Sequence, residues 1–433
     1  MLGVILDDQL NGLPHINQTG EKMIRILNRL TIAKHKRGLS GKVLKVLYKR
    51  TLERILVYAA PAWWTGSNAQ TSKLLSIQRK VLLAVTGAFR TTSTLALQTS
   101  SGIEPLDLVC AQETAWYHIK KSCVDTSFCS SGRFQMERTL PVFLRVPSSW
   151  TLVQWDRIPT FQDLVIFTDG SKINGQVGAA FCTFNKGAVQ EHQYRLDDHC
   201  SVFQAEAVAI KEAIKWAARH FPQSNCNIHT DSLSVLMALQ NPLLKNDQIL
   251  WIRSNLNDKI ALHWVKAHIG IEGNEAADRA AKNATTKPAI DIHLGIPQNT
   301  IRSHLKELLQ KEWQKRWDDR EAKGRFTHAI FPSVSRTRCI FNKYDIQAVS
   351  NHGLCPQFLR RFNLRNCSCR CGEDNLDDIH HYIYRCPLLG HLRERIKPST
   401  PILSILSHPA LREEMRSLLK TVFGNERDIF QDN

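Results

Sequence analysis

Four acidic side chains in the middle of the chain have the residue type and placement for metal-ion chemistry: Asp169, Glu206, Asp231 and Asp278. Asp169 closes a short apolar run, Asp231 follows a short expected strand, and Asp278 lies one turn into an alanine-rich segment. Each acid alone has a structural explanation, as a turn residue, a helix N-cap or a charge near a helix N-terminus. Their joint placement is the informative feature.

Glu206 is the most telling of the four. It lies in an expected helix over residues 202–220 and shares a face with Ile210, Ile214 and Ala217. A carboxylate on an apolar face costs free energy unless a cation or a donor compensates it. The alternative is an acid at the edge of that face, where the helix dipole stabilises negative charge, and both interpretations stay open on spacing alone.

Four carboxylates that converge on one place would repel one another, so they stay ionised only around multivalent cations. Oxygen ligands select hard ions, and we therefore expect two Mg²⁺ or Mn²⁺ ions. Two such ions, about 4 Å apart, can bracket a scissile phosphate, activate a bound water and stabilise the leaving 3′ oxygen. Cutting RNA and not DNA requires contact with the 2′-hydroxyl group.

The elements that position these acids follow from the periodicity of the sequence. Strands are expected over 164–167, 177–184, 189–196, 227–230 and 260–265, with a hairpin turn at Asn174-Gly175. Helices are expected over 202–220, 233–239 and 274–284. Three strands followed by alternating helices and strands predict an α/β fold, a mixed five-stranded sheet with packed helices.

At this point the residues resemble a known family, type 1 ribonuclease H. The resemblance rests on four blocks: Phe167-Thr-Asp-Gly-Ser171, Gln204-Ala-Glu206, His229-Thr-Asp-Ser232 and His268-Ile-Gly-Ile-Glu-Gly-Asn-Glu-Ala-Ala-Asp278. It implies a ribonuclease H-like fold over 161–288, a metal-binding role for the four acids, and a mobile loop histidine, His268, that assists proton transfer or product release. The short interval between Asp231 and Asp278 lacks the basic protrusion with which some members grip the hybrid.

The flanks resemble the stretch after the polymerase core in non-LTR, jockey-like retrotransposon reverse transcriptases. The similar segments are Leu2-Gly-Val-Ile-Leu-Asp7, residues 47–64 and residues 87–99. There is no Tyr-x-Asp-Asp box, so the chain resembles the C-terminal part of such a polyprotein. Polymerase activity is not expected.

A cluster of cysteines and histidines follows near the C-terminus. Cys369, Cys371, His381 and Cys386 form a ligand set suited to tetrahedral Zn²⁺. His380 is an alternative ligand, Cys367 is a spare thiol, and reduced structural cysteines are the competing interpretation. The same motif resembles one near the end of such retrotransposon proteins. Four arginines lie close to this cluster in the sequence: Arg360, Arg361, Arg365 and Arg370. Their positive charge predicts contact with template RNA or target DNA.

The remaining organisation comes from composition. The net charge of +17 is concentrated outside the centre, with +11 over residues 1–150 and +6 over 291–433; this suits a polyanionic partner or simply a basic surface. No stretch predicts a membrane span or signal peptide, so we expect an intracellular protein, in either the nucleus or the cytoplasm. The expected segments are 1–120 helical and thumb-like, 121–160 linker, 161–288 ribonuclease H, 289–350 helical connector, 351–395 zinc module and 396–433 helical tail.

The leading functional expectation is endonucleolytic hydrolysis of the RNA strand of RNA–DNA hybrids by two metal ions. The alternative is a non-catalytic nucleic-acid-binding remnant of a retroelement. A DNA-strand transferase on the same fold is disfavoured, because such enzymes generally use three acids. The sequence leaves the oligomeric state open.

Overall fold

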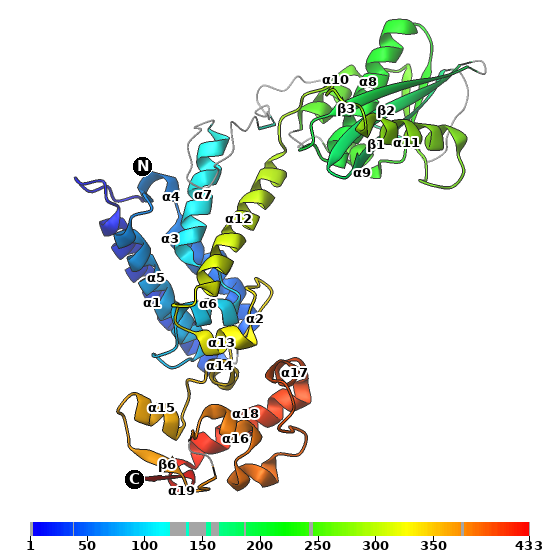
Figure 1. The fold of residues 1–433 in the computed structure, drawn as a ribbon. Coiled ribbons are helices and arrows are strands. Elements are labelled where there is room, and N and C mark those ends of the chain that lie inside the picture. Colours follow the sequence, from blue (N-terminus) through cyan, green and yellow to red (C-terminus); the bar gives the residue numbers. More distant parts are fainter. Residues whose placement is uncertain are drawn as a thin grey trace. The chain divides into compact units, whose positions relative to one another are not determined.

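The structure is a computed structural model (Figure 1). It describes residues 3–37, 39–121, 136–137, 153–156, 164–185, 188–241, 246–373 and 376–432. The described residues form two compact units, one made of 3–118 with 305–432 and a second within 119–304. Most of the expected linker over 121–160 lies outside the described residues.

The second unit is built on a five-stranded sheet in the order β3-β2-β1-β4-β5. β1 pairs antiparallel with β2, and β2 with β3, whereas β4 runs parallel to both β1 and β5. The predicted mixed five-stranded sheet is thereby confirmed. The strands are β1 (Leu164–Ile173), β2 (Gln176–Asn185), β3 (Ala188–Leu196), β4 (Cys226–Thr230) and β5 (Ile260–Trp264).

The predicted hairpin joins β1 to β2. Asn174 and Gly175 both have positive φ angles, 51° and 86°, and Ile173 pairs with Gln176 directly across the turn. Two consecutive positive φ angles match the twist of the two strands, and Asn-Gly is the pair that adopts them most readily. β1 extends further than the expected run over 164–167 because this hairpin continues its pairing with β2.

Four helices complete this unit: α8 (Val202–His220), α9 (Leu233–Gln240), α10 (Asp247–Asn255) and α11 (Glu272–Thr285). α8 packs on one face of the sheet, where Ile166 of β1 contacts its apolar stripe. α11 packs on the opposite face, against Val165 and Phe167. This division follows from the alternation of side chains along a strand. α10 is a helix that the sequence analysis did not predict.

The first unit is mainly helical. Its N-terminal elements are α1 (Leu13–Arg37), α2 (Gly41–Leu47), the π-helical turn η1 (Tyr48–Leu52), α3 (Glu53–Val57), α4 (Ala60–Trp63), α5 (Asn68–Thr86), α6 (Thr94–Ser101) and α7 (Leu106–Lys120). They share one core with Leu309, Trp313 and Trp317 of α12 (Gln298–Asp318). The helical character expected over residues 1–120 is interrupted at Ala59, whose φ is 52°. Pro61 follows, and it lacks the amide hydrogen that a continuous helix requires.

The C-terminal part of the first unit forms a second core. Its elements are α13 (Arg325–Ile330), α14 (Lys343–Ser350), α15 (Pro356–Arg361), β6 (Cys367–Cys369), α16 (Ile379–Tyr384), η4 (Pro387–Leu392), α17 (Ile402–Ser407), α18 (Pro409–Gly424), α19 (Glu426–Ile429) and β7 (Phe430–Asp432). Cys369 and Cys386 pack with Leu418 and Phe430, and β6 pairs antiparallel with β7. The segments expected as a module over 351–395 and a tail over 396–433 therefore share one hydrophobic core.

The described helices include none with both the length and the apolar composition needed to cross a bilayer.

Candidate active site

Three of the four predicted acids meet beside the C-terminal end of β4, where β1 continues past its pairing with β4. Asp169 lies within β1, Asp231 directly follows β4, and Glu206 lies in the second turn of α8. One carboxylate oxygen from each of the three lies within 4.8 Å of the others. Parallel pairing of β1 with β4 brings the two aspartates to the same edge of the sheet.

The close approach of α8 to β1 depends on Gly170. A β-carbon at this position would lie 2.5 Å from the backbone nitrogen of Glu206 and 2.8 Å from the carbonyl carbon of Ala205. Only glycine leaves room for the helix backbone at this distance. The start of α8 is fixed by a capping box in which Ser201 and Gln204 exchange hydrogen bonds between side chain and backbone.

Burial and mutual repulsion oppose ionisation of two of these acids. Burial, with the charges of Asp231 and Asp278, raises the pKa of Asp169 to about 7. Burial, with the charges of Asp169 and Asp231, raises the pKa of Glu206 well above its ordinary value. The Glu206 oxygen Oε2 is buried and has no hydrogen-bond partner within the described part of the chain. A cation between the three carboxylates would remove both penalties.

Asp231 has two neighbours that hold its position. The side-chain amide of Asn274 donates to its oxygen Oδ2 at 3.2 Å, and the indole N–H of Trp264 donates to its backbone carbonyl at 3.2 Å. Asn274 belongs to the predicted motif, but no role was assigned to it from sequence. Its contact with Asp231 joins the first turn of α11 to the residue that follows β4, two segments far apart in the sequence.

Asp278 lies at the margin of the group, and its carboxylate is not among the three that lie within 4.8 Å. It forms an ion pair with Lys282, one turn further along α11, at 2.8 Å. Its charge nevertheless contributes to the raised pKa of Asp169. Asp278 and Lys282 are four residues apart in a helix, a spacing that favours an ion pair. The sequence could therefore have indicated this pair, although it was not predicted.

Close packing of α11 brings Asp278 to this site. A β-carbon at Gly273 would lie 2.2 Å from the ring of Phe167, and one at Gly178 would lie 2.4 Å from the carbonyl oxygen of Ala281. The face of α11 that meets the sheet consists of small residues such as Ala277 and Ala280. These small side chains let the helix pack closely on the sheet.

His268 lies in the loop between β5 and α11. It is exposed, and its φ of 55° places its backbone in the left-handed region. His268 is the first residue of the predicted motif, and the structure places it on the loop that leads into α11. It does not belong to the group of three carboxylates that lie within 4.8 Å of one another.

The donor set at this site consists of carboxylate oxygens, which suit Mg²⁺ or Mn²⁺ better than softer ions. Three such groups within 4.8 Å, together with the unpartnered Oε2 of Glu206, fit a hard divalent cation. A divalent cation at this place would offset the mutual repulsion of the three carboxylates, which otherwise raises the pKa values of Asp169 and Glu206.

The cysteine and histidine residues form a second group with metal-ligand character. Cys369, Cys371, His381 and Cys386 each bring one ligand atom to within 4.8 Å of the others. The sulfur atoms of Cys369 and Cys386 are 3.8 Å apart, and Cys371 Sγ lies 3.4 Å from His381 Nε2. A hydrogen bond from Cys386 is the largest cause that lowers the pKa of Cys369 to about 3.

Two further residues of the motif, the alternative ligand His380 and the spare thiol Cys367, lie outside the four-ligand group. His380 directs Nε2 to the backbone carbonyl of Ala348 at 2.8 Å. Cys367 is buried at the start of β6, where it pairs with Asp432 of β7. The geometry therefore favours His381 over His380, and it gives Cys367 a place in the hydrophobic core. Asp377, which sequence reasoning did not single out, accepts the amide N–H of Cys369 at 3.1 Å.

The four arginines predicted to contact nucleic acid differ in their surroundings. Arg360 bonds Asp377, Arg365 pairs with Glu426 and Asp432, and Arg370 donates to the backbone carbonyl of Phe430. These contacts give the three residues a structural role in holding the module. Arg361 is exposed and lies over the ring of Phe362, 5.6 Å from its centre.

The fold and the carboxylate site together define a ribonuclease H domain. Residues 162–286 match the RNase H family, which confirms the central resemblance predicted from the sequence.

The relatives of the chain are named as retrotransposon and retroviral proteins. It is 32% identical over 123 residues to a protein of Popillia japonica named "Retrovirus-related Pol polyprotein from type-1 retrotransposable element R1", covering 28% of this chain and 49% of that protein. It is 36% identical over 106 residues to a protein of the same name from Bradysia coprophila, covering 23% of this chain and 10% of the relative. The Pol polyprotein of equine infectious anemia virus (strain Wyoming) is 34% identical over 124 residues, covering 28% of this chain and 10% of the relative. The matches thus span about half or less of these relatives' lengths, and their names agree with the predicted likeness to a retrotransposon polyprotein.

Proposed function

We propose that the ribonuclease H domain hydrolyses the RNA strand of RNA–DNA hybrids endonucleolytically with divalent metal ions, Mg²⁺ or Mn²⁺. The observation that carries this proposal is the meeting of Asp169, Glu206 and Asp231, whose oxygens lie within 4.8 Å. A buried carboxylate with an unpartnered oxygen is costly in a merely structural role.

Asp169, Glu206 and Asp231 would hold the metal, and Asp278 would complete the acidic set from α11. Two bound ions would supply an activated water and charge stabilisation at the leaving oxygen. Asn274 holds the orientation of Asp231 through its hydrogen bond. Lys282 neutralises Asp278 while the acid has no other cation beside it.

His268 is proposed to move a proton at the cleavage site or to assist product release. Its exposure and its place on the loop before α11 leave the imidazole accessible to substrate. The positive φ at this position is uncommon for a residue other than glycine and points to a loop conformation selected for function.

Zn²⁺ is proposed for the second group, with Cys369, Cys371, His381 and Cys386 as ligands. The support is the convergence of three sulfur atoms and one imidazole nitrogen within 4.8 Å. Zinc there would stabilise the core that β6 shares with β7 and α18. Template RNA or target DNA remains the proposed partner of this part of the chain, as part of a retrotransposon-derived protein.

The test is incubation of the full chain with Mg²⁺ and three labelled duplexes of one sequence: RNA–DNA hybrid, RNA–RNA and DNA–DNA. The proposal predicts internal cuts in the RNA strand of the hybrid alone. Binding of the hybrid by a folded protein without any cut would instead establish the alternative, a non-catalytic nucleic-acid-binding remnant. Equal cutting of all three duplexes would contradict the assignment of a hybrid-specific nuclease.

A further inference from the structure

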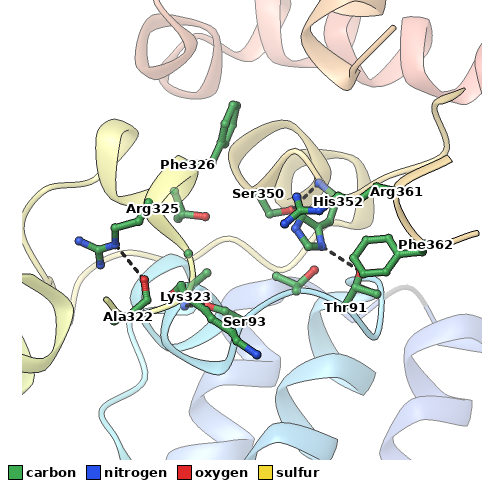
Figure 2. Close-up of a pocket in the computed structure, with 14 residues that line it drawn as sticks. Thr91, Ser93, Ala322, Lys323, Arg325, Phe326, Ser350, His352, Arg361 and Phe362 are labelled. Atoms are coloured by element: carbon green, nitrogen blue, oxygen red, sulfur yellow. Dashed lines mark hydrogen bonds between the residues drawn. The ribbon is translucent and has the colours of Figure 1, made fainter. Parts of the chain in front are cut away.

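A cavity of about 420 Å³ lies in the first unit, well apart in sequence from the carboxylate site. Figure 2 shows its walls, which come from the loop and first turn of α6 (residues 91–96), the segment 322–327 leading into α13, and residues 350–362. Hydroxyl groups, two phenyl rings, a histidine and three cationic side chains line it, and none of the described residues that line it is acidic.

Two of the three cationic side chains lack an acidic partner within the described ranges. Lys323 and Arg361 are exposed, and neither forms an ion pair with another of the described residues. Arg360, directly before Arg361, is tied to Asp377, and the third cation of the cavity, Arg325, donates to the backbone carbonyls of Ala322 and Trp317. Lys323 and Arg361 therefore leave positive charge available to an anionic ligand.

A buried hydroxyl group in the wall has no protein partner. Thr92 is 1% exposed, and its Oγ1 has no hydrogen-bond partner within the described ranges. Buried hydroxyl groups are nearly always hydrogen-bonded, so the Thr92 hydroxyl is a polar group beside the cavity that no described residue satisfies. Its neighbour Thr91 is by contrast occupied, because its hydroxyl lies 2.8 Å from Nδ1 of His352.

The cavity also offers aromatic surface. Phe362 is half-buried beneath Arg361, and its ring lies 5.9 Å from that of His352. Burial and the charge of Arg361 lower the pKa of His352 to about 4, so this ring is neutral at pH 7. Phe326 is 36% exposed at the opposite wall. Such rings bind nucleobases by stacking, with little preference for sequence.

The shape of the cavity is held by Gly324. Its φ is 106°, and a β-carbon there would lie 2.7 Å from the hydroxyl oxygen of Ser93. Ser93 in turn donates to the backbone carbonyl of Lys323 at 3.0 Å. The segment that carries Lys323 is thus fixed against the start of α6, which keeps this cation at the cavity.

We propose that this cavity binds one nucleotide of a single-stranded nucleic acid, with the phosphate at Lys323 and Arg361 and the base against Phe362. Thr92 supplies a further hydrogen bond. An acidic peptide would pair with Lys323 and Arg361, but it would offer no planar ring to stack on Phe362 or on the neutral His352. The proposal does not depend on catalysis by the ribonuclease H domain, which belongs to the other unit.

The test measures binding of fluorescein-labelled 12-nucleotide oligo(U) and oligo(dT) to the full chain by fluorescence anisotropy. The protein carries Asp231→Asn so that no strand is cut, and the buffer holds zinc but no magnesium. The double variant Lys323→Gln/Arg361→Gln is expected to bind on the order of tenfold more weakly. The slope of log affinity against log salt concentration should become shallower by about 0.7, the contribution of one neutralised phosphate on a single strand.

The matched control is Arg395→Gln/Lys420→Gln, which removes the same charge at exposed positions of the same unit. Its affinity is expected to stay within about twofold of the unmodified protein if the cavity is the site. Equal losses in both double variants would overturn the proposal, since only overall charge would then matter. Labelled poly-glutamate that competes as well as the oligonucleotide would overturn it in favour of an acidic peptide.

A second measurement is independent of how the variants fold. Oligo(U) containing one 4-thiouridine is photo-crosslinked to the chain with the Asp231→Asn change alone, and the modified peptides are identified by mass spectrometry. We expect crosslinks in the peptides that hold Phe362 or Phe326. Crosslinks found solely in other peptides would overturn the proposal, whatever the hybrid-cleavage assay shows.

Discussion

Gly170 lies so close to Glu206 that a β-carbon at the glycine would come within 2.5 Å of the backbone nitrogen of the glutamate. This contact sets the distance between α8 and β1, and therefore the distance between the Glu206 and Asp169 carboxylates. The geometry of the carboxylate group thus depends on a residue that contributes no carboxylate.

The first prediction concerns this contact. Gly170→Ala should push α8 away from β1, lower the free energy of unfolding by about 1–3 kcal/mol, and reduce hybrid cleavage by at least about tenfold. Gly390→Ala is the control, because a β-carbon there meets nothing within 4 Å. Thermal unfolding and initial cleavage rates measure both effects. Normal cleavage by Gly170→Ala would show that the spacing of α8 and β1 is not critical.

The second prediction separates stability from catalysis at Glu206. Glu206→Gln removes a buried carboxylate that is repelled by Asp169 and Asp231. In metal-free buffer at pH 8 the variant should therefore unfold at a higher temperature than the unmodified protein, while its Mg²⁺-dependent cleavage falls by about 100-fold or more. A lower unfolding temperature in metal-free buffer would indicate that the ionised carboxylate stabilises the fold.

The third prediction concerns pH. The pKa of Asp169 is raised from 3.8 to about 7, so between these values the folded metal-free domain binds more protons than the unfolded chain. Its free energy of unfolding should therefore fall as pH rises from about 4 through about 7. Metal binding requires the ionised carboxylate, so Mg²⁺ affinity should rise over the same range. Titration calorimetry at pH 6 and at pH 8 measures the Mg²⁺ affinity. Equal affinities at the two pH values would contradict the assignment of Asp169 as a metal-binding residue.

The fourth prediction distinguishes two neighbouring histidines. His381→Ala should lose bound zinc and lower the unfolding temperature of the C-terminal core, because its Nε2 lies within the ligand group. His380→Ala should keep zinc, since its Nε2 contacts a backbone carbonyl. Metal content by mass spectrometry decides between them. Retention of one zinc per chain by His381→Ala would contradict the proposed ligand set.

Much of the second unit was predictable from sequence because local patterns determine it. The apolar run before Asp169 and the Asn174-Gly175 turn indicated β1 and its hairpin, and the helix over 202–220 was predicted with the observed bounds. The four acids stood out through their joint placement, and Glu206 also through its position on the apolar face of α8.

Other features depend on contacts between distant residues. The hydrogen bond from Asn274 to Asp231 and the pairing of β6 with β7 join segments whose meeting no local pattern encodes. α10 was missed because its apolar residues, Ile249, Leu250 and Ile252, lack a simple one-sided spacing. The cavity lined by Thr92, Lys323 and Arg361 likewise brings together three separate segments.

The central claim is that the clustered carboxylates cut RNA paired with DNA. The most direct measurement compares the unmodified chain with Asp231→Asn and with Asp258→Asn, which changes an exposed acid outside the site. Each protein is given the same labelled hybrid and Mg²⁺. We expect a cleavage rate at least about 100-fold lower in Asp231→Asn, with Asp258→Asn equal to the unmodified chain. Equal cleavage by all three proteins would contradict the claim.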